Sequence, residues 1–367
     1  MKIECSKNRL QKGISLCERV VSHNLSLPIL KNVLLESDKN NLTLKATNLD
    51  IGIEVNIPAK VDDKIKTAFN PNILSTFLSN LKNEDKIFIN LDNDNLHIET
   101  EFNNTLIKSE SSEDFPIIPQ IKDDKNISLL AEDLVYGIKS VLYSATVSDI
   151  KPEIASVYIY ELNGEIVFVA TDSFRLAEKR VKLKNKINNF KPIIIPVRNA
   201  GEIIKVFEGE IDEIKITSDN NQISLWGNNI HFTSRLIDGV YPDYKQIMPK
   251  AFKTTIEIEK NNFIQALRLS NIFSNNFNQI KIKVLKDKQQ LVLESENAEK
   301  GKNTTVIKCK INGEDFEAFY NVKYILDYFN SSSDEIVVIG LNEQNKPLHI
   351  NDLNNSTFSY IIMPVNR

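Results

Sequence analysis

The amino-acid sequence predicts an α+β protein in which one domain type, two helices packed on antiparallel sheet, occurs three times. Three observations predict this class. The chain repeats itself with a period of roughly 125 residues, each repeat contains two segments in which a strand runs into an amphipathic helix, and alternating apolar and polar residues lie between these segments. Repetition of whole units indicates a surface assembled from similar parts.

The first strand and helix of each unit have matching sequences. These segments are 1–22, 126–148 and 254–274. Equivalent helix positions within them are Leu10, Leu134 and Phe263, which are separated by 124 and 129 residues. Each helix has apolar residues on one side, which favours packing of that side on a sheet.

The second strand and helix of each unit repeat with a still more regular spacing. Their segments are 67–81, 193–207 and 317–330. Equivalent positions are Leu74, Ala200 and Leu326, separated by 126 and 126 residues. A strand hairpin follows each second helix, and period-two alternation in runs such as Leu42–Ala46 and Ile280–Val284 predicts the strands between the helices. The expected order is β-α-β-β-β-α-β-β-β.

Two polar stretches that contain proline separate the units. They are Phe115–Asn126 and Tyr241–Lys253. Proline fixes φ and cannot donate to a sheet ladder, so both stretches are expected to be extended connectors. We therefore predict domains at 1–120, 121–248 and 249–367.

The composition is that of an ordinary globular protein, with 41% hydrophobic and 26% charged residues. The net charge of −4 argues against a surface coated in basic residues but allows a local basic lining. Three cysteines without metal-like spacing, a beginning without an apolar signal segment, and apolar runs no longer than a strand predict a cytoplasmic protein that does not contact membranes.

The sequence shows none of the common motifs of enzyme active sites. The four histidines lie apart, only 11 glycines are available for phosphate-binding loops, and no nucleophile-elbow or nucleotide-binding pattern occurs. The triplet Thr171-Asp172-Ser173 is compatible with a nucleophile turn, but a hairpin turn is favoured because strands flank it. We predict a non-catalytic protein without cofactor or metal. Two alternatives remain open: an enzyme acting at a cleft between units, and a scaffold that binds peptides or saccharides.

Basic residues lie on the predicted helices, off the apolar stripes. A line of cations on repeated helices would suit phosphate contacts without base recognition, although a solvated helix face has the same appearance. The candidate DNA-facing residues are Lys7, Lys12, Lys139, Arg198, Lys205 and Lys323.

Several stretches resemble the bacterial sliding clamp family, the β subunit of the replicative DNA polymerase. The stretch VATDSFRLAEKRV is similar to the A-T-D-G-H-R-L-A hairpin of that family, and YIIMPVNR is similar to its Met-Pro ending. The segments that carry the resemblance are Val169–Val181, Ser234–Pro249, Tyr360–Arg367, Leu27–Glu36 and Lys151–Ile159. Their order and spacing extend the resemblance over the whole chain.

The resemblance implies a DNA processivity factor that acts in DNA replication. It implies a head-to-tail homodimer, in which two chains of three domains close a six-domain ring around double-stranded DNA without sequence preference. The edge of the first domain near Asn103–Ser109 would join the edge of the third near Asn297–Thr305. Asn103 and Asn104 stand where arginines would be expected at this contact.

The resemblance also implies a pocket that binds short linear peptides of the replicative polymerase, the clamp loader and repair factors. Carried over residue by residue, the pocket consists of Ile154, Thr171, Ser173, Phe174, Arg175, Leu176, Pro242, Gln246, Ile247, Asn321, Tyr324, Ile361, Ile362, Met363, Pro364 and Val365.

Three departures from the family pattern predict an altered peptide preference and a changed DNA contact. Ser173-Phe174 replaces Gly-His in the hairpin, and Gln246 stands where a basic residue is frequent. The loop Ser22–Ser26 lacks an arginine that the family places near Asn24 to touch DNA.

Overall fold

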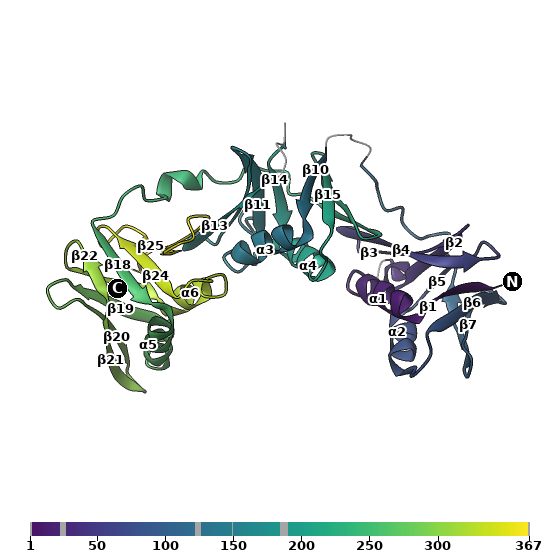
Figure 1. Ribbon diagram of the computed structural model, residues 1–367, viewed down its shortest axis with the longest axis horizontal. Coiled ribbons are helices and arrows are strands. Elements are labelled where there is room, and N and C mark those ends of the chain that lie inside the picture. Colours follow the sequence, from purple (N-terminus) through teal and green to yellow (C-terminus); the bar gives the residue numbers. More distant parts are fainter. Residues whose placement is uncertain (1, 23–26, 122–125, 149, 184–189, 366–367) are drawn as a thin grey trace. The chain divides into compact units, whose positions relative to one another are not determined.

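The computed structural model describes residues 2–22, 27–121, 126–148, 150–183 and 190–365 (Figure 1). The loop in which the family's arginine is lacking therefore lies mostly outside the described residues. The chain packs as two compact units. The first comprises Met1–Glu132, Asn188–Phe190 and Gly201–Asp238, and the second comprises Asp133–Ile187, Lys191–Ala200 and Gly239–Arg367.

The first unit is built on one large antiparallel sheet. Its path runs β10-β15-β16-β17-β4-β1-β6-β7-β8, and β2, β3, β5 and β9 branch from it. The elements are β1 (Ile3–Ser6), α1 (Lys7–Glu18), η1 (Pro28–Lys31), β2 (Val33–Asp38), β3 (Asn41–Thr47), β4 (Ile51–Val61), β5 (Lys66–Phe69), α2 (Pro71–Asn80), β6 (Lys86–Asp92), β7 (Asn95–Glu99), β8 (Asn104–Ile107), β9 (Ser109–Glu110), β10 (Asn126–Leu130), β15 (Glu213–Ser218), β16 (Gln222–Gly227) and β17 (Ile230–Arg235).

The second unit contains two antiparallel sheets, ordered β14-β11-β12-β13-β26-β25-β24-β18-β22 and β21-β20-β19-β23. Helix α4 (Val197–Phe207) begins in this unit and ends in the first. The elements are α3 (Ala131–Leu142), β11 (Ser156–Leu162), β12 (Glu165–Thr171), β13 (Arg175–Lys182), β14 (Ile193–Pro196), η2 (Tyr244–Ile247), β18 (Thr254–Glu259), α5 (Lys260–Ile272), β19 (Gln279–Leu285), β20 (Gln290–Asn297), β21 (Gly301–Lys308), β22 (Lys310–Asn312), β23 (Phe316–Asn321), α6 (Val322–Tyr328), β24 (Ile336–Leu341), β25 (Leu348–Asp352) and β26 (Phe358–Ile362).

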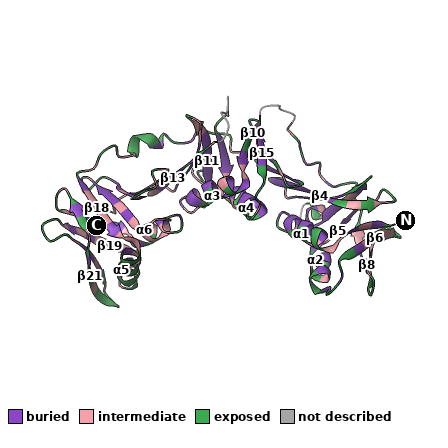
Figure 2. Ribbon diagram, in the orientation of Figure 1, coloured by how far each residue is buried: buried purple, intermediate pink, exposed green. Residues whose placement is uncertain are grey.

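The apolar stripes of the helices are buried, as the residue spacing predicted. Figure 2 shows the buried and exposed stretches along the helices and strands. In α1, Leu10, Ile14 and Cys17 are fully buried. Gly13 lies on the same side, where an added Cβ would come within 3.0 Å of side-chain carbons of Leu44 and Ile57. A larger residue there would require these two side-chain ends to shift by a few tenths of an ångström, so glycine suits the close packing of α1.

Side-chain caps fix where several helices begin. Asn70 and Asn321 precede α2 and α6, and each side-chain oxygen accepts a hydrogen bond from the backbone N–H two residues later. Such caps satisfy amide groups that have no partner within the helix. The same cap at the same point of two repeats agrees with the predicted threefold α+β architecture, which the structure confirms. The predicted order is wrong in one respect: four strands, β2 to β5, lie between α1 and α2 where three were expected, and β9 and β22 are short additional strands.

None of the helices in the described part of the chain is long and apolar enough to cross a membrane. All three cysteines are free thiols, with Cys5 and Cys17 buried and Cys309 half-buried. Burial raises the pKa of the Cys5 thiol to about 12 and that of Cys309 to about 11. These thiols are therefore protonated at neutral pH and poorly nucleophilic.

Candidate peptide-binding site

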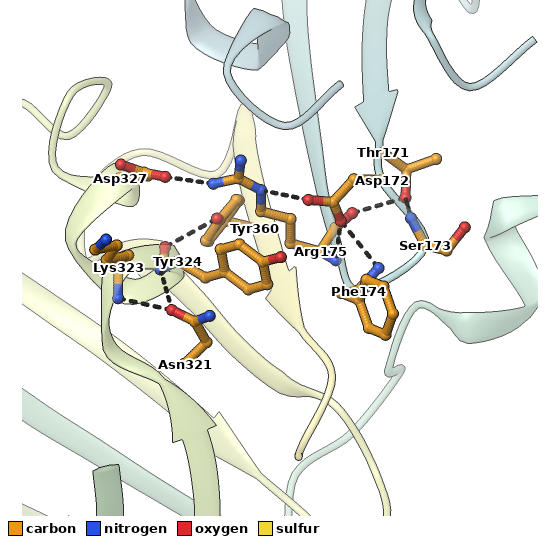
Figure 3. Close-up of polar contacts among 10 residues, drawn as sticks. All are labelled: Thr171, Asp172, Ser173, Phe174, Arg175, Asn321, Lys323, Tyr324, Asp327 and Tyr360. Carbon is orange, nitrogen blue, oxygen red and sulfur yellow. Dashed lines mark hydrogen bonds and ion pairs between the residues drawn. The ribbon is translucent and has the colours of Figure 1, made fainter. Parts of the chain in front are cut away.

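The hairpin between β12 and β13 is a rigid turn held by its own side chains (Figure 3). The Thr171 hydroxyl donates to the carbonyl oxygen of Arg175 at 2.6 Å and accepts from the N–H of Ser173 at 3.1 Å. Asp172 Oδ1 accepts from the N–H groups of Phe174 and Arg175, both at 2.9 Å. These bonds identify a structural Asx turn, so the favoured interpretation of Thr171-Asp172-Ser173 agrees with the geometry.

This turn holds Ser173 in the left-handed region, with φ of 76°. Phe174 follows with 62% of its surface exposed, an unusual position for an aromatic side chain. Because the turn is fixed by four hydrogen bonds, the Phe174 ring is presented to solvent from a rigid base.

Arg175 connects the hairpin to α6. Its Nε donates to Asp172 Oδ2 at 2.9 Å, and one of its terminal nitrogens forms an ion pair with Asp327. The guanidinium carbon lies 4.4 Å from the ring centroid of Tyr324, within cation–π distance. Burial opposes the charge of this group, but Tyr360, Asp327 and Asp172 outweigh it and raise the pKa of Arg175. The guanidinium of Arg175 is thus held by side chains of the same unit.

The beginning of α6 lies beside this cluster. Asn321 Oδ1 accepts from the N–H groups of Lys323 and Tyr324 at 2.9 and 3.4 Å. The Tyr360 hydroxyl, from β26, donates to the carbonyl oxygen of Tyr324 at 2.9 Å. The strand and the helix are therefore joined at the residue that stacks on Arg175.

The C-terminal strand β26 adds to β13 as a further antiparallel strand. Arg175 pairs with Ile362 and Leu176 with Ile361, and all three apolar members of these pairs are buried. Beyond the strand, the N–H of Met363 donates to the carbonyl oxygen of Phe174 at 2.7 Å. Leu176, Ile361 and Ile362 consequently form the floor beneath the site rather than its accessible surface.

The accessible apolar residues of the site come from three segments. Phe174 and Ile247 are exposed, and Met363, Pro364 and Val365 are half-buried. The N–H of Val365 donates to the carbonyl oxygen of Phe319 at 2.8 Å, which ties the chain end to β23. An apolar surface with few polar groups is typical of sites that bind peptides.

The connector that carries Pro242, Gln246 and Ile247 is attached to the sheet by an aromatic anchor. The buried Tyr244 hydroxyl donates to Glu178 Oε2 on β13 at 2.5 Å and lies 2.7 Å from the Tyr160 hydroxyl. Gln246 Nε2 donates to Asp243 at 2.8 Å. These hydrogen bonds attach the connector to the sheet at Tyr244. Ile154, a further predicted pocket residue, is half-buried in the turn before β11.

Hydrogen bonds, an ion pair and strand pairing join the parts of the predicted pocket that lie in the hairpin, α6 and the C-terminal strand, whereas no such contact joins Ile154, Pro242, Gln246 or Ile247 to them within the described residues. The structure also adds residues that sequence reasoning missed. Asp327, Tyr143 and Tyr360 surround Arg175. Tyr360 lies in the C-terminal motif but was not assigned to the pocket, and nothing in the local sequence marked Asp327 or Tyr143. The pairing of Asp327 with Arg175 cannot be predicted from the sequence, because only the fold brings the two side chains together.

Some of the predicted DNA-facing cations already form a hydrogen bond or an ion pair with other residues of the chain. Lys7 Nζ donates to the carbonyl oxygen of Leu81 at 2.7 Å, behind the end of α2. Lys12 pairs with Glu210 at 2.5 Å and Lys205 with Glu202 at 2.6 Å.

The other predicted cations, Lys139, Arg198 and Lys323, are exposed. Arg198 and Lys323 form no ion pair through their side chains with any residue that the structure describes. Sequence reasoning missed Arg9 and Arg268, which are exposed on α1 and α5 and equally unpaired within the described chain. Their helical positions away from the apolar stripe were the signal that could have found them.

The two segments predicted to join neighbouring chains are edge strands. Strand β8 ends the path of the first sheet, and β21 ends that of its own sheet. Leu106 and Val306 on these strands are exposed apolar residues. An edge strand presents unpaired backbone groups to a further strand.

Comparison with known proteins covers the whole chain. Models of the DNA polymerase III beta subunit match residues 1–119 as its N-terminal domain, 129–243 as its central domain and 245–366 as its C-terminal domain. The beta sliding clamp of Synechocystis sp. is 28% identical over 389 residues, covering 100% of this chain and 99% of that protein. The beta sliding clamp of Bacillus subtilis is 25% identical, with coverage of 100% and 99%.

Solved structures share the fold. The DNA polymerase III subunit beta from Pseudomonas aeruginosa has a TM-score of 0.94 at 21% identity, covering 100% of both chains. A sliding clamp from Bacillus subtilis has a TM-score of 0.94 at 22% identity, covering 100% of this chain and 99% of that one. Because all three family models match in order and together span nearly the entire sequence, this chain belongs to the DNA polymerase III beta subunit family.

Proposed function

We propose that this chain is a non-catalytic DNA sliding clamp, which encircles duplex DNA as a homodimeric ring and tethers the replicative polymerase and other DNA-processing factors. The observation that carries the proposal is the match of all three domains to one family, supported by relatives that are beta sliding clamps. Three similar domains per chain suit a closed ring. Head-to-tail contacts between identical chains close a ring when the rotation from one chain to the next divides a full turn.

Ring closure would pair β8 of one protomer with β21 of its partner. Both strands are edges within the described chain, and each carries an exposed apolar residue, Leu106 or Val306. Pairing them would satisfy backbone groups that an open arc exposes. The predicted domains 1–120, 121–248 and 249–367 would each supply one sixth of the ring.

The ring is tested by small-angle X-ray scattering with an absolute mass. A hollow particle of twice the chain mass is expected. Val306→Asp should shift the mass to that of one chain at micromolar concentration. The control is Ile211→Asp, which places the same charge at another exposed β-branched residue and should leave the dimer intact. A compact monomer in the unmodified protein would contradict the ring.

DNA contact would rest on cations of the helices, without base recognition. Among the candidate residues, Arg198 and Lys323, together with Arg9 and Arg268, have charges that no described residue neutralises. Weak phosphate contacts suit a clamp, because encirclement retains the protein while it slides.

Partner peptides would bind at the surface formed by Phe174, Ile247, Met363, Pro364 and Val365. Two or three apolar anchors, each burying a side chain for about 1.5–3 kcal/mol, give affinities near the micromolar range after the entropic cost of binding. Affinity of this order allows partners to exchange on a ring that stays on DNA.

A labelled pentapeptide of the Gln-Leu-x-Leu-Phe type tests this assignment by fluorescence anisotropy. Met363→Asp places a charge among the apolar contacts and should weaken binding at least tenfold, by roughly 1.4 kcal/mol or more. Ile211→Asp is the matched control. Equal binding to the unmodified protein and to Met363→Asp would contradict the assignment.

A further inference from the structure

The first unit contains a cavity of about 560 Å³ where β4, β17 and the connector after β9 meet. Half of its fourteen lining residues are polar or charged, and the other half are apolar residues and one glycine. The residues used below are Leu49, Asp50, Pro116, Ile117, Arg235 and Leu236. None of them belongs to the pocket or the DNA-facing set derived from the sequence.

The turn that borders this cavity repeats the turn of the peptide site bond for bond. The Thr47 hydroxyl donates to the carbonyl oxygen of Ile51 at 2.8 Å and accepts from the N–H of Leu49 at 3.0 Å. Asn48 Oδ1 accepts from the N–H groups of Asp50 and Ile51 at 3.0 and 2.8 Å. In the peptide site the same four bonds are made by the turn that begins at Thr171.

The strand added beside the turn is repeated as well. Ile51 pairs with Ser234 in the first unit, as Arg175 pairs with Ile362 in the second. The next N–H, that of Arg235, donates to the carbonyl oxygen of Asp50 at 2.8 Å. Met363 makes the equivalent bond in the peptide site at 2.7 Å. By this correspondence Arg235 stands where the peptide site has Met363.

The connectors also correspond. Phe115-Pro116-Ile117-Ile118 has a buried first and fourth residue, and Tyr241-Pro242-Asp243-Tyr244 has the same pattern. Pro116 therefore occupies the place of Pro242. The cavity is thus the repeat-related counterpart of the proposed peptide pocket, formed by the turn, the added strand and the connector together.

The backbone conformation of Leu49 is unfavourable for a leucine. Its φ is 76°, as in Ser173, and its side chain remains 41% exposed on the cavity wall. A bulky residue in the left-handed region is strained, and strain of this kind concentrates at binding sites. Ile117, with 93% of its surface exposed, adds a second apolar group to the wall.

Two charged residues line the cavity, Asp50 and Arg235, and the guanidinium of Arg235 indicates what it would bind. The side chain of Arg235 is exposed and makes no ion pair or hydrogen bond with any residue in the described part of the chain. A guanidinium with free donors binds a carboxylate through two parallel hydrogen bonds. In the peptide site the equivalent position holds the apolar Met363, so the two sites differ in the charge that they select.

We propose that this cavity is a second peptide-binding site, specific for a short extended segment that carries both an apolar and an acidic side chain. The apolar side chain would lie against Leu49, Pro116 and Leu236, and the carboxylate would bind Arg235. The proposal deepens the proposed function, since it gives each chain a second place for the same class of partner.

Methyl NMR spectra of the full chain, labelled at leucine, isoleucine and methionine, test the proposal. The probe is the pentapeptide Gln-Leu-Asp-Leu-Phe with an acetylated N-terminus. We expect saturable shifts at the methyl groups of Leu49 and Leu236 that persist in Met363→Asp. Arg235→Gln should weaken this binding about tenfold, the usual loss for a charge-assisted pair, and replacement of the peptide Asp by Asn should have a similar effect.

Leu49→Gly provides a variant that keeps the fold, because glycine adopts positive φ without strain. It should abolish the shifts at Leu236 while those at Met363 remain. Shifts confined to the Met363 site, unaffected by Leu49→Gly or Arg235→Gln, would overturn the second site and leave the proposed function standing. Shifts at Leu49 and Leu236 without any at Met363 would support the second site and count against the proposed peptide pocket.

Discussion

The guanidinium of Arg175 lies over the ring of Tyr324, with 4.4 Å between the guanidinium carbon and the ring centroid. Arg175 begins β13, next to the Asx turn, and Tyr324 lies in the first turn of α6. Together with the ion pairs to Asp172 and Asp327, this contact connects a hairpin and a helix that are far apart in the sequence. It holds the base of the proposed peptide site.

Replacing Arg175 should therefore destabilise the second unit as well as the site. In Arg175→Met the two carboxylates lose their partner, and because Asp327 is partly exposed we expect a loss near 2 kcal/mol, below that of a fully buried pair. Urea unfolding measures it. Lys64→Met, which removes an exposed pair with Asp38, is the control and should change nothing measurable. Equal stability of the two variants would refute the structural role of Arg175.

Two histidines, the buried His231 and the half-buried His349, should make stability depend on pH. Burial lowers the pKa of His231 and of His349 to about 4. The unfolded chain binds protons near pH 6.5 while the folded chain stays neutral, so stability is lost as the pH falls from about 6.5 towards 4. Each histidine contributes about 1.4 kcal/mol per pH unit within this window.

Urea unfolding at pH 7 and pH 5 measures this dependence. Between these values His231→Asn should lose about 2 kcal/mol less than the unmodified protein, because one of the two groups no longer titrates. Each protein is compared with itself at the two pH values, so a change in stability that the substitution causes at every pH cancels. An unchanged slope in the variant would show that the pKa of His231 is the same in the folded and the unfolded chain.

Unpaired helix cations should contribute more to DNA binding than paired ones. Each phosphate contact adds about 0.9 to the slope of log affinity against log salt concentration. Arg198→Gln should lower this slope by about that amount. Lys205→Gln should lower it less, because Lys205 already pairs with Glu202 at 2.6 Å. Filter binding to a duplex of random sequence across a salt series measures both slopes, and the reverse order would contradict the assignment.

The free thiols should react slowly although one of them is half-buried. With its pKa raised to about 11, Cys309 is far less ionised at pH 8 than an ordinary thiol. Reaction with a disulfide reagent should be on the order of a hundredfold slower than that of a free cysteine. The absorbance of the released thiolate follows the reaction. One thiol reacting at the normal rate would place Cys309 in a more open environment.

Leu49 should be replaceable by glycine at little cost in stability. Release of the left-handed strain, about 1–2 kcal/mol, offsets the greater chain entropy of glycine in the unfolded state. We expect a change of less than about 1 kcal/mol in the free energy of unfolding. Leu44→Ala, at a fully buried position on the neighbouring strand, should cost about 2–5 kcal/mol and serves as the contrast. A comparable loss in both variants would mean that Leu49 serves the core.

The repeated architecture could be predicted because it depends on local patterns. Leu10 and Ile14 share one face of α1, as helical periodicity requires, and both are fully buried. The alternation Ile280–Val284 became β19, with every second side chain buried. The Asx turn at Thr171 followed in the same way from residues that bond within a few positions of one another.

The sequence by itself determined the number of repeats, their helices and strands, and the turn chemistry at Thr171, since each depends on residues close along the chain. Only the tertiary structure decided that Asp327 neutralises Arg175, that Lys7 is held by the carbonyl oxygen of Leu81, and that Leu49 and Arg235 line a common cavity. These contacts join residues that are tens to hundreds of positions apart. Their partners are selected by packing and by the pairing of charges in space, which spacing along the sequence does not encode.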